Sequence, residues 1–345
     1  MNPLASPPPP VRRLPGPGLA VGVRLPGLGL AVGIAVLATG AGLLVPVVGA
    51  PIVAIVLGAA VRGVLGRRGY WPRLRTGAAF AGRYVLQAAV VVFGLGLSLR
   101  AVLRVGLHSL PVMLGTLAVC LCGAWLLGAA LRGPVDLRAL IGAGTGICGA
   151  SAIGAVTPVI GAAEVTVAYA VSTIFVYNVA AALLFPPLGH LMGLGDHGFG
   201  LWAGTAINDT SSVLAAGFSV SRAAGEYAVI VKLVRSLMIV PVVVGVAALW
   251  RRRGGTRPRL HRLVPVFLWL FLLAALADTV GLVPGAAHAA LGTLATFLVA
   301  VALAGIGTGI DVGDLRRSGP RPVLLGGLLW VLVAGTSLAI QALLG

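Results

Sequence analysis

The sequence predicts an all-α polytopic membrane protein, and its composition and apolar patterning lead to this prediction. Of its 345 residues, 59% are hydrophobic and only 10% are charged, and the mean hydropathy is +1.05. A soluble domain carries roughly a quarter charged residues, so the bilayer must solvate most of this apolar surface. The apolar residues form continuous runs rather than alternating ones, which favours transmembrane helices over a barrel.

The apolar runs predict about 10–11 transmembrane segments, because each run is close to the ~20 residues that a spanning helix needs. The runs lie at residues 27–46, 51–66, 79–99, 109–131, 139–161, 165–189, 200–220, 227–249, 263–282, 290–310 and 322–344.

The distribution of positive charge predicts the orientation. The net charge of +17 comes almost wholly from arginine, with Lys232 as the only lysine, and the arginines lie in short loops between apolar runs. Cytoplasmic loops of membrane proteins are enriched in this way, so nucleic acid is not an expected partner. The two densest loops, 251–262 and 62–75, place the N-terminus in the cytoplasm, although Arg100 and Arg104 then fall outside.

Two internal repeats are present, and the first predicts inverted topology. The stretch Phe93–Ser98, followed by Pro111–Gly115, matches Ala304–Gly309, followed by Pro322–Gly326. The arginine count sends the first of these helices outward and the second inward. The two copies are therefore expected to have opposite orientations in the membrane, as in many secondary transporters.

The second repeat aligns Gly144–Ile153 with Gly204–Val213 through a shared Gly-Thr-x-Ile-x-x-x-Ser string. Glycine and hydroxyl residues suit a broken helix that lines a cavity better than a lipid-facing helix. Each Gly-Thr segment is therefore expected to be broken or re-entrant, and a full crossing stays open as the alternative. We hypothesise that two hairpins, separated by the helix 165–189, enter from opposite faces and that their tips meet near the midplane.

The hydroxyl and amide side chains of these segments are the predicted substrate-binding groups. Half-helix N-termini present free N–H groups and a positive dipole end to anions. The alternative is that small residues let the helices pack closely. The candidates are Thr145, Ser151, Asn208, Thr210, Ser211 and Ser212.

Asp209 is the predicted coupling-ion site. A carboxylate within a membrane segment costs roughly 2.5–3.5 kcal/mol on insertion scales, so it is expected to bind a coupling H⁺ or Na⁺, or to pair with a cation. The alternative is an N-cap for the helix that follows, and the two roles are compatible.

Lys232 and Arg235 supply positive charge on one helix face, three residues apart. Arg235 falls about 14 Å into its span at the helical rise, close to the middle of the membrane. Two interpretations stay open: the pair attracts an anionic substrate, or it neutralises Asp209. Arg83, early in its own span, is expected to snorkel to the interface.

The sequence contains no nucleotide-binding motif and no paired catalytic constellation, so the chain is not expected to be an enzyme. We expect no catalytic residue, no metal site and no cofactor other than a coupling ion. The three cysteines, Cys120, Cys122 and Cys148, have neither disulfide nor metal spacing. Energy for transport would come from an ion gradient or from the solute's own gradient.

The motif residues resemble a known family. Gly144–Ile153 is similar to its central motif, and Leu201–Val213, followed by Ala215–Gly217 and Val231–Arg235, is similar to a second block. The chain thus resembles the YeiH-like sulfate exporter family of bacterial inner-membrane proteins. The resemblance implies a multi-pass secondary transporter with inverted repeats. Asn208 is a departure, because many members carry His there, so a proton-handling role built on that His does not transfer.

The leading functional prediction is an exporter of a small inorganic anion, sulfate or a related sulfur oxyanion, that works by alternating access in a bacterial inner membrane. Residues 1–26 are expected to be a disordered cytoplasmic tail, and residues 27–345 a single transmembrane transporter domain. A cation/proton antiporter is the first alternative, and a membrane scaffold without transport is the second. The expected partners are the lipid bilayer and the anion, and a homodimer stays open.

Overall fold

The computed structural model describes residues 21–44, 49–67, 70–250, 264–309 and 320–344, and every regular element within them is a helix. Residues 1–20 of the predicted tail (residues 1–26) lie outside the described residues. Helix α1 begins at Val21, six residues before the first predicted span.

The helices follow one another with short connections. Their bounds are α1 Val21–Leu44, α2 Gly49–Arg67, α3 Trp71–Phe80, the π-helix η1 Ala81–Val85, α4 Leu86–Gly94, α5 Leu99–Ala130, α6 Val135–Gly146, α7 Ala150–Ile160, α8 Glu164–Leu191, α9 Asp196–Ala206, α10 Thr210–Val220, α11 Arg222–Leu237, α12 Ile239–Trp250, α13 Val266–Thr279, α14 Ala287–Thr308 and α16 Pro320–Leu344.

Each predicted apolar run falls on a helical segment, and the two Gly-Thr runs are each broken into two helices. Among the described residues, seven helical segments are long and apolar enough to cross a membrane. Shorter apolar helices supplement them, among them α7, α10 and α13. The predicted all-helical membrane fold is confirmed, and the number of 10–11 membrane segments stays a prediction.

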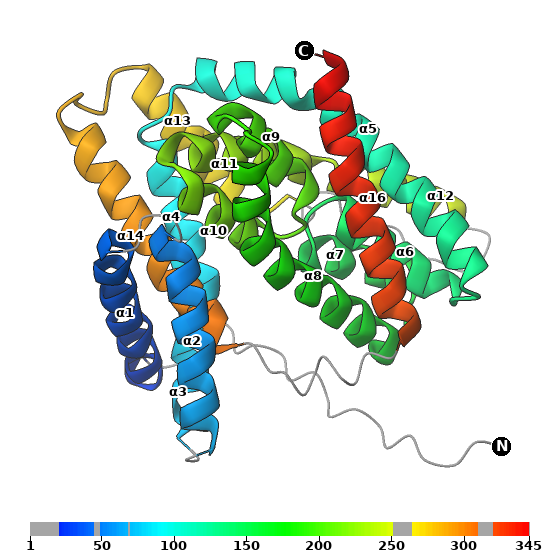
Figure 1. Ribbon diagram of the computed structural model, residues 1–345, viewed down its shortest axis with the longest axis horizontal. Helices are drawn as coiled ribbons and strands as arrows, with labels where there is room; N and C mark the ends of the chain where they lie inside the picture. Colours follow the sequence, from blue (N-terminus) through cyan, green and yellow to red (C-terminus); the bar gives the residue numbers. More distant parts are fainter. Residues whose placement is uncertain (1–20, 45–48, 68–69, 251–263, 310–319, 345) are drawn as a thin grey trace.

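The helices form two bundles that lie side by side (Figure 1). The first bundle contains α1 to α4 with η1, α13 and α14. The second contains α5 to α12 and α16, with two apolar core clusters of its own. The largest core cluster centres on the first bundle and reaches Leu214 of α10 and Leu233 of α11. The two bundles therefore share an apolar contact along α10 and α11.

Helices α6 and α7 form a hairpin, which we call hairpin 1 (residues 135–160). The chain leaves helical geometry at Ile147 and resumes it after Gly149. Gly144 of α6 faces α7 closely, because a Cβ atom on Gly144 would lie 3.0 Å from the side chain of Ile153. The glycine of the first Gly-Thr motif thus lets the two arms of the hairpin pack.

Helices α9 and α10 form hairpin 2 (residues 196–220), which turns at Ile207–Asp209. Its two ends lie together, because Ser221 Oγ donates a hydrogen bond of 2.6 Å to the carboxylate of Asp196. Gly204 of the second Gly-Thr motif packs against α11, where a Cβ atom would lie 2.8 Å from the carbonyl oxygen of Ala228.

The two hairpins open toward opposite ends of the molecule. Three residues separate the end of hairpin 1 from the start of α8, and four residues separate the end of α8 from the start of hairpin 2. With 28 residues, α8 is about 42 Å long at 1.5 Å per residue. The tips of both hairpins meet beside the middle of this helix, near Ile174 and Asn178.

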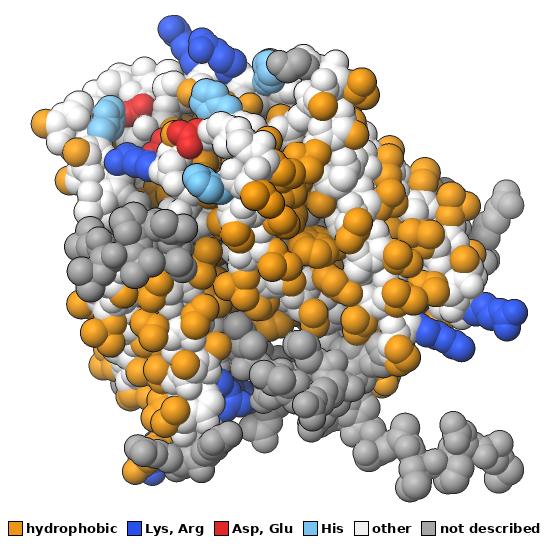
Figure 2. All heavy atoms as spheres, in the orientation of Figure 1, with side chains coloured by type: hydrophobic (Ala, Val, Ile, Leu, Met, Phe, Trp, Pro, Cys, Tyr) orange, Lys and Arg blue, Asp and Glu red, His pale blue; other side chains and the backbone are white. Residues whose placement is uncertain are grey.

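The surface of the molecule is apolar over much of its height. Large hydrophobic side chains are exposed on the outward faces of long helices, among them Val36, Leu126, Leu273 and Val331. Figure 2 shows these side chains covering the middle of one face, with acidic and histidine side chains gathered toward one end. Such a surface suits contact with lipid rather than water.

Candidate functional site

The two hairpin tips touch each other at Gly149 and Asp209. Gly149 has φ +64° and ψ −129°, a conformation that side chains with a Cβ atom rarely adopt. A Cβ atom placed on Gly149 would lie 3.5 Å from the Cβ of Asp209. The second Gly-Thr string carries Asp209 at the position equivalent to Gly149, so the two breaks face each other.

Lys232 and Arg235 of α11 donate hydrogen bonds to backbone carbonyl oxygens at the hairpin tips. Lys232 Nζ donates hydrogen bonds of 2.8 Å to the carbonyl oxygens of Ile147 and Ile207, one from each tip. Arg235 Nε donates a hydrogen bond of 2.9 Å to the carbonyl oxygen of Gly146. Both cationic side chains are fully buried. They therefore lie at the C-terminal ends of α6 and α9, where the helix dipoles favour positive charge.

The opposite side of the tips carries the N-terminal ends of α7 and α10. The first turns of these helices have N–H groups without intrahelical partners and a positive dipole end. The charges at each tip are thus separated: the carbonyl end of its first helix meets a cation of α11, and the N-terminal end of its second helix carries the N–H groups.

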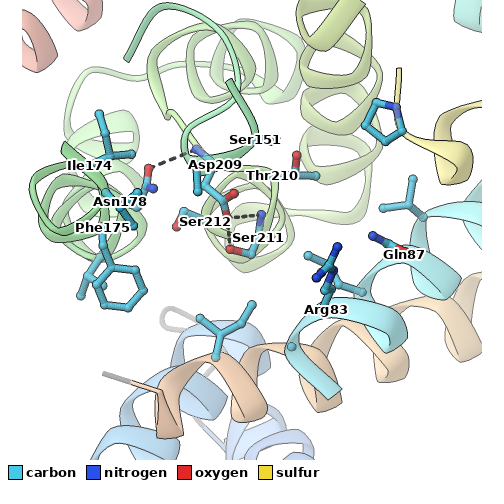
Figure 3. A pocket seen from close by; sticks show the side chains of 18 of the residues that line it. Arg83, Gln87, Ser151, Ile174, Phe175, Asn178, Asp209, Thr210, Ser211 and Ser212 are labelled. Carbon is cyan, nitrogen blue, oxygen red and sulfur yellow. Dashed lines mark hydrogen bonds between the residues drawn. The ribbon is translucent and has the colours of Figure 1, made fainter. Parts of the chain in front are cut away.

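The N-terminal ends face a cavity of about 590 Å³ between the two bundles. The first bundle contributes residues from α2, η1, α4 and α14 and from the start of α13, and the second contributes residues from α7, α8 and α10. Figure 3 shows the polar groups of this cavity. They are Arg83, Gln87, Ser151, Asn178, Asp209, Thr210, Ser211 and Ser212.

Asp209 is the N-cap of α10 and also lines the cavity. Its carboxylate accepts a hydrogen bond of 3.0 Å from the N–H of Ser211 and a second bond from the Ser211 hydroxyl. The N–H of Asp209 donates a 3.1 Å hydrogen bond to Asn178 Oδ1 of α8. Asp209 therefore caps α10, and its carboxylate is also open to the cavity.

The structure brings five of the nine predicted site residues to the cavity wall: Ser151, Asp209, Thr210, Ser211 and Ser212. The other four, Thr145, Asn208, Lys232 and Arg235, are buried and do not line it. The hydroxyl of Thr145 and the side-chain oxygen of Asn208 make no hydrogen bond within the described part of the chain. Lys232 and Arg235 were predicted either to attract the anion or to neutralise Asp209. The structure instead shows them donating hydrogen bonds to carbonyl oxygens at the helix ends.

Three polar side chains of the cavity, Asn178, Arg83 and Gln87, were not among the predicted site residues. Asn178 lies within the apolar run 165–189. A polar amide is unusual in such a run, so its position alone could have identified it as a candidate site residue. Arg83 was expected to snorkel, but it lines the cavity from the π-helix η1. Gln87 follows four residues later, which places it on the same helix face as Arg83. That spacing is the signal that sequence reasoning could have used.

Comparison with known proteins places the chain in a family. Residues 26–326 match the family described as Conserved hypothetical protein 698. The chain belongs to this family. Its bacterial relatives include a UPF0324 membrane protein of Streptococcus agalactiae serotype V, 38% identical over 315 residues, which cover 88% of this chain and 92% of the relative. A UPF0324 membrane protein of Streptococcus pyogenes serotype M3 is 40% identical over 318 residues, with the same coverage of 88% and 92%.

A third relative, from Clostridium tetani, is 37% identical over 332 residues, which cover 90% of this chain and 95% of the relative. It too is called a UPF0324 membrane protein. Membership of the Conserved hypothetical protein 698 family therefore confirms a multi-pass membrane protein of bacterial type. These names state no substrate, so the sulfate exporter assignment suggested by the motifs stays a prediction.

Proposed function

We propose that this member of the Conserved hypothetical protein 698 family is a secondary transporter of a small anion, sulfate or a related sulfur oxyanion, that works by alternating access. The observation that carries the proposal is the separation of N–H groups from carbonyl groups at the hairpin tips. The N–H ends of α7 and α10 face the cavity, while the carbonyls of Ile147 and Ile207 are taken by Lys232. The N–H groups of Asp209 and Ser211 are already hydrogen-bonded, and the remaining N–H groups at the start of α7 and α10 are donors that suit an oxyanion.

The proposal includes two re-entrant hairpins that enter the membrane from opposite faces and belong to inverted repeats. The opposite openings of the hairpins along α8 support this. So does the packing of α5 against α16, the two helices that follow the first sequence repeat. Gly115 of α5 faces Ile340 of α16, and Gly123 faces Leu332, so these two helices run antiparallel.

The positive-inside rule orients the molecule. Two arginines, Arg132 and Arg138, lie at the open end of hairpin 1. The open end of hairpin 2 carries one, Arg222, which is paired with Glu226. We therefore assign the open end of hairpin 1 and the N-terminus to the cytoplasm, in a bacterial inner membrane. Both bundles then span the bilayer, and relative movement of the bundles would expose the cavity to either side.

Asp209 would couple transport to protons. An ionised carboxylate repels an oxyanion that enters the cavity, and protonation removes this repulsion. The donors beside Asp209 and the positive Arg83 on the opposite wall would then both favour the anion.

The test is a thermal-unfolding panel on detergent-purified protein with sulfate, sulfite, thiosulfate, sulfonates, carboxylates and sodium over a pH series. A ligand at 100 times its Kd stabilises by about 2.7 kcal/mol. We expect a shift with an oxyanion that is lost in Thr210→Pro, because proline fits the first position of α10 but removes the Thr210 N–H that the anion would approach. The matched control is Ser219→Ala, at the far end of α10 and outside the cavity lining. A panel with no oxyanion shift at any pH would refute the proposal.

A cation/proton antiporter is a second candidate, because the Asp209 carboxylate faces the cavity beside the amide of Asn178. Oxygen ligands of this kind bind sodium. A shift with sodium alone, lost in Asp209→Asn, would favour this candidate over anion transport.

A further inference from the structure

The walls of the cavity differ sharply in chemistry. The hairpin tips and Asn178 form a polar wall, as described above, and Arg83 and Gln87 face it from the first bundle (Figure 3). Much of the remaining lining is apolar: Ile55, Leu86, Val90, Phe175, Phe267 and Ile306. These residues come from five different helices, so the apolar part of the cavity is built by both bundles.

Arg83 is the group best placed to fix an anionic head against the polar wall. Its side chain is exposed to the cavity from η1, and within the described residues no carboxylate lies within ion-pair distance of its guanidinium. Guanidinium binds oxyanions through two parallel N–H groups. Gln87, one turn later on the same face, adds an amide donor.

Among sulfur oxyanions, the size and apolar lining of the cavity favour one that carries an organic group over bare sulfate. A volume of about 590 Å³ lies in the range typical of pockets for organic ligands. A bare sulfate ion would leave the apolar wall in contact with water only. A ligand with an apolar body would displace that water and gain the hydrophobic contact.

We infer that the cavity takes an organic oxyanion with a short apolar body, its head held between Arg83 and the hydroxyls of α10, its body against Ile55, Phe175, Phe267 and Ile306. This inference rests on the proposed anion transport and narrows its substrate class. Arg83 is then a specificity-determining residue that lies on the opposite bundle from the hairpins. A bound substrate therefore bridges the two bundles that must move relative to each other.

The experiment measures Kd for inorganic sulfate and for methane-, ethane-, propane- and butanesulfonate on the full-length purified protein. Affinity should rise about fourfold per methylene, which is the free energy of one buried CH₂ converted at the usual tenfold per 1.4 kcal/mol. Arg83→Gln should weaken every sulfonate at least tenfold, the loss expected for a charge-assisted hydrogen bond. Arg104→Gln, on an exposed position of α5 outside the cavity lining, is the matched control and should leave all Kd values unchanged.

A second variant tests the apolar body independently. Val179→Phe fills part of the cavity from α8 and should abolish binding of butanesulfonate while methanesulfonate still binds. Tighter binding of sulfate than of every sulfonate, or a Kd that does not change with chain length, would overturn this inference and leave anion transport standing. If no anion binds the wild-type protein, the proposed function itself fails.

Discussion

At the scale of single residues, Gly149 and Asp209 define the contact between the hairpin tips. Gly149 turns the chain through a conformation reserved for glycine and brings its backbone against Asp209. Asp209 in turn caps α10, and its own N–H donates a hydrogen bond to the side-chain oxygen of Asn178. The conformation of one residue and the cap of the other together place the N–H groups of α7 and α10 at the cavity.

Gly149→Ala should destabilise the protein by about 1–3 kcal/mol, the cost of holding a residue with a Cβ atom at an unfavourable φ. Gly154→Ala is the matched control, because Gly154 lies within α7 with open space around it. There the alanine should be neutral or stabilise by about 0.5–1 kcal/mol. Thermal unfolding in detergent compares the two variants, and equal stability of both would contradict the assigned role of Gly149.

Asp209→Asn should separate capping from proton coupling. Asparagine caps helices about as well as aspartate, so the unfolding temperature should change little. Binding of an oxyanion should become independent of pH, whereas the wild-type protein should bind it more tightly as the pH falls. A variant that keeps the wild-type pH dependence of Kd would show that another group carries the proton.

At the scale of helices, α11 is the element that joins the two hairpins. Its polar face carries Lys232 and Arg235 at the depth of the tips, and the rest of that helix is packed against α9 and α10. Cations that satisfy buried carbonyls at helix C-termini combine a dipole interaction with a charged hydrogen bond. Helix α11 therefore stabilises both hairpins through a pair of side chains.

Lys232→Met should destabilise the protein by roughly 3 kcal/mol or more, because two buried carbonyls lose hydrogen bonds from a charged donor, each worth about 1.5–3 kcal/mol. Glu226→Gln, at the start of the same helix, is the control. It breaks the exposed ion pair with Arg222, and such pairs contribute about 0–1 kcal/mol. If Lys232 bound substrate instead, Lys232→Met would keep the stability of the unliganded protein and lose only the ligand-induced shift.

At the scale of the whole molecule, two bundles enclose the cavity and the hairpins open at opposite ends of one of them. This arrangement makes a prediction that a pair of fully crossing segments does not make. The two ends of each hairpin must lie on one side of the membrane, and the two hairpins must differ in side.

Accessibility labelling tests this prediction in a background without Cys120, Cys122 and Cys148. The single variants Ala130→Cys and Ala163→Cys, which flank hairpin 1, should label from the cytoplasmic side. Gly195→Cys and Ala223→Cys, which flank hairpin 2, should label from the opposite side. All four positions are exposed at helix ends. Labelling of Ala130→Cys and Ala163→Cys from different sides would show that the first segment crosses the membrane.

Much of the fold was predictable from the sequence because it depends on local composition. Continuous apolar runs determine which segments become long helices, and a Gly-Thr string with polar residues marks where two of those helices break. Ser151, Asp209 and the three residues after Asp209 were predicted for the same reason, because each of them lies at the break itself.

Only the tertiary structure decided which charges face the cavity. Arg83 lines it, whereas Lys232 reaches Ile147, which is 85 residues earlier in the chain. Whether a cation meets a carbonyl or an open cavity depends on how helices distant in sequence pack around it. The sequence by itself thus determined the membrane class and the broken segments, and the packing of the two bundles decided which side of each break would be free to meet a ligand.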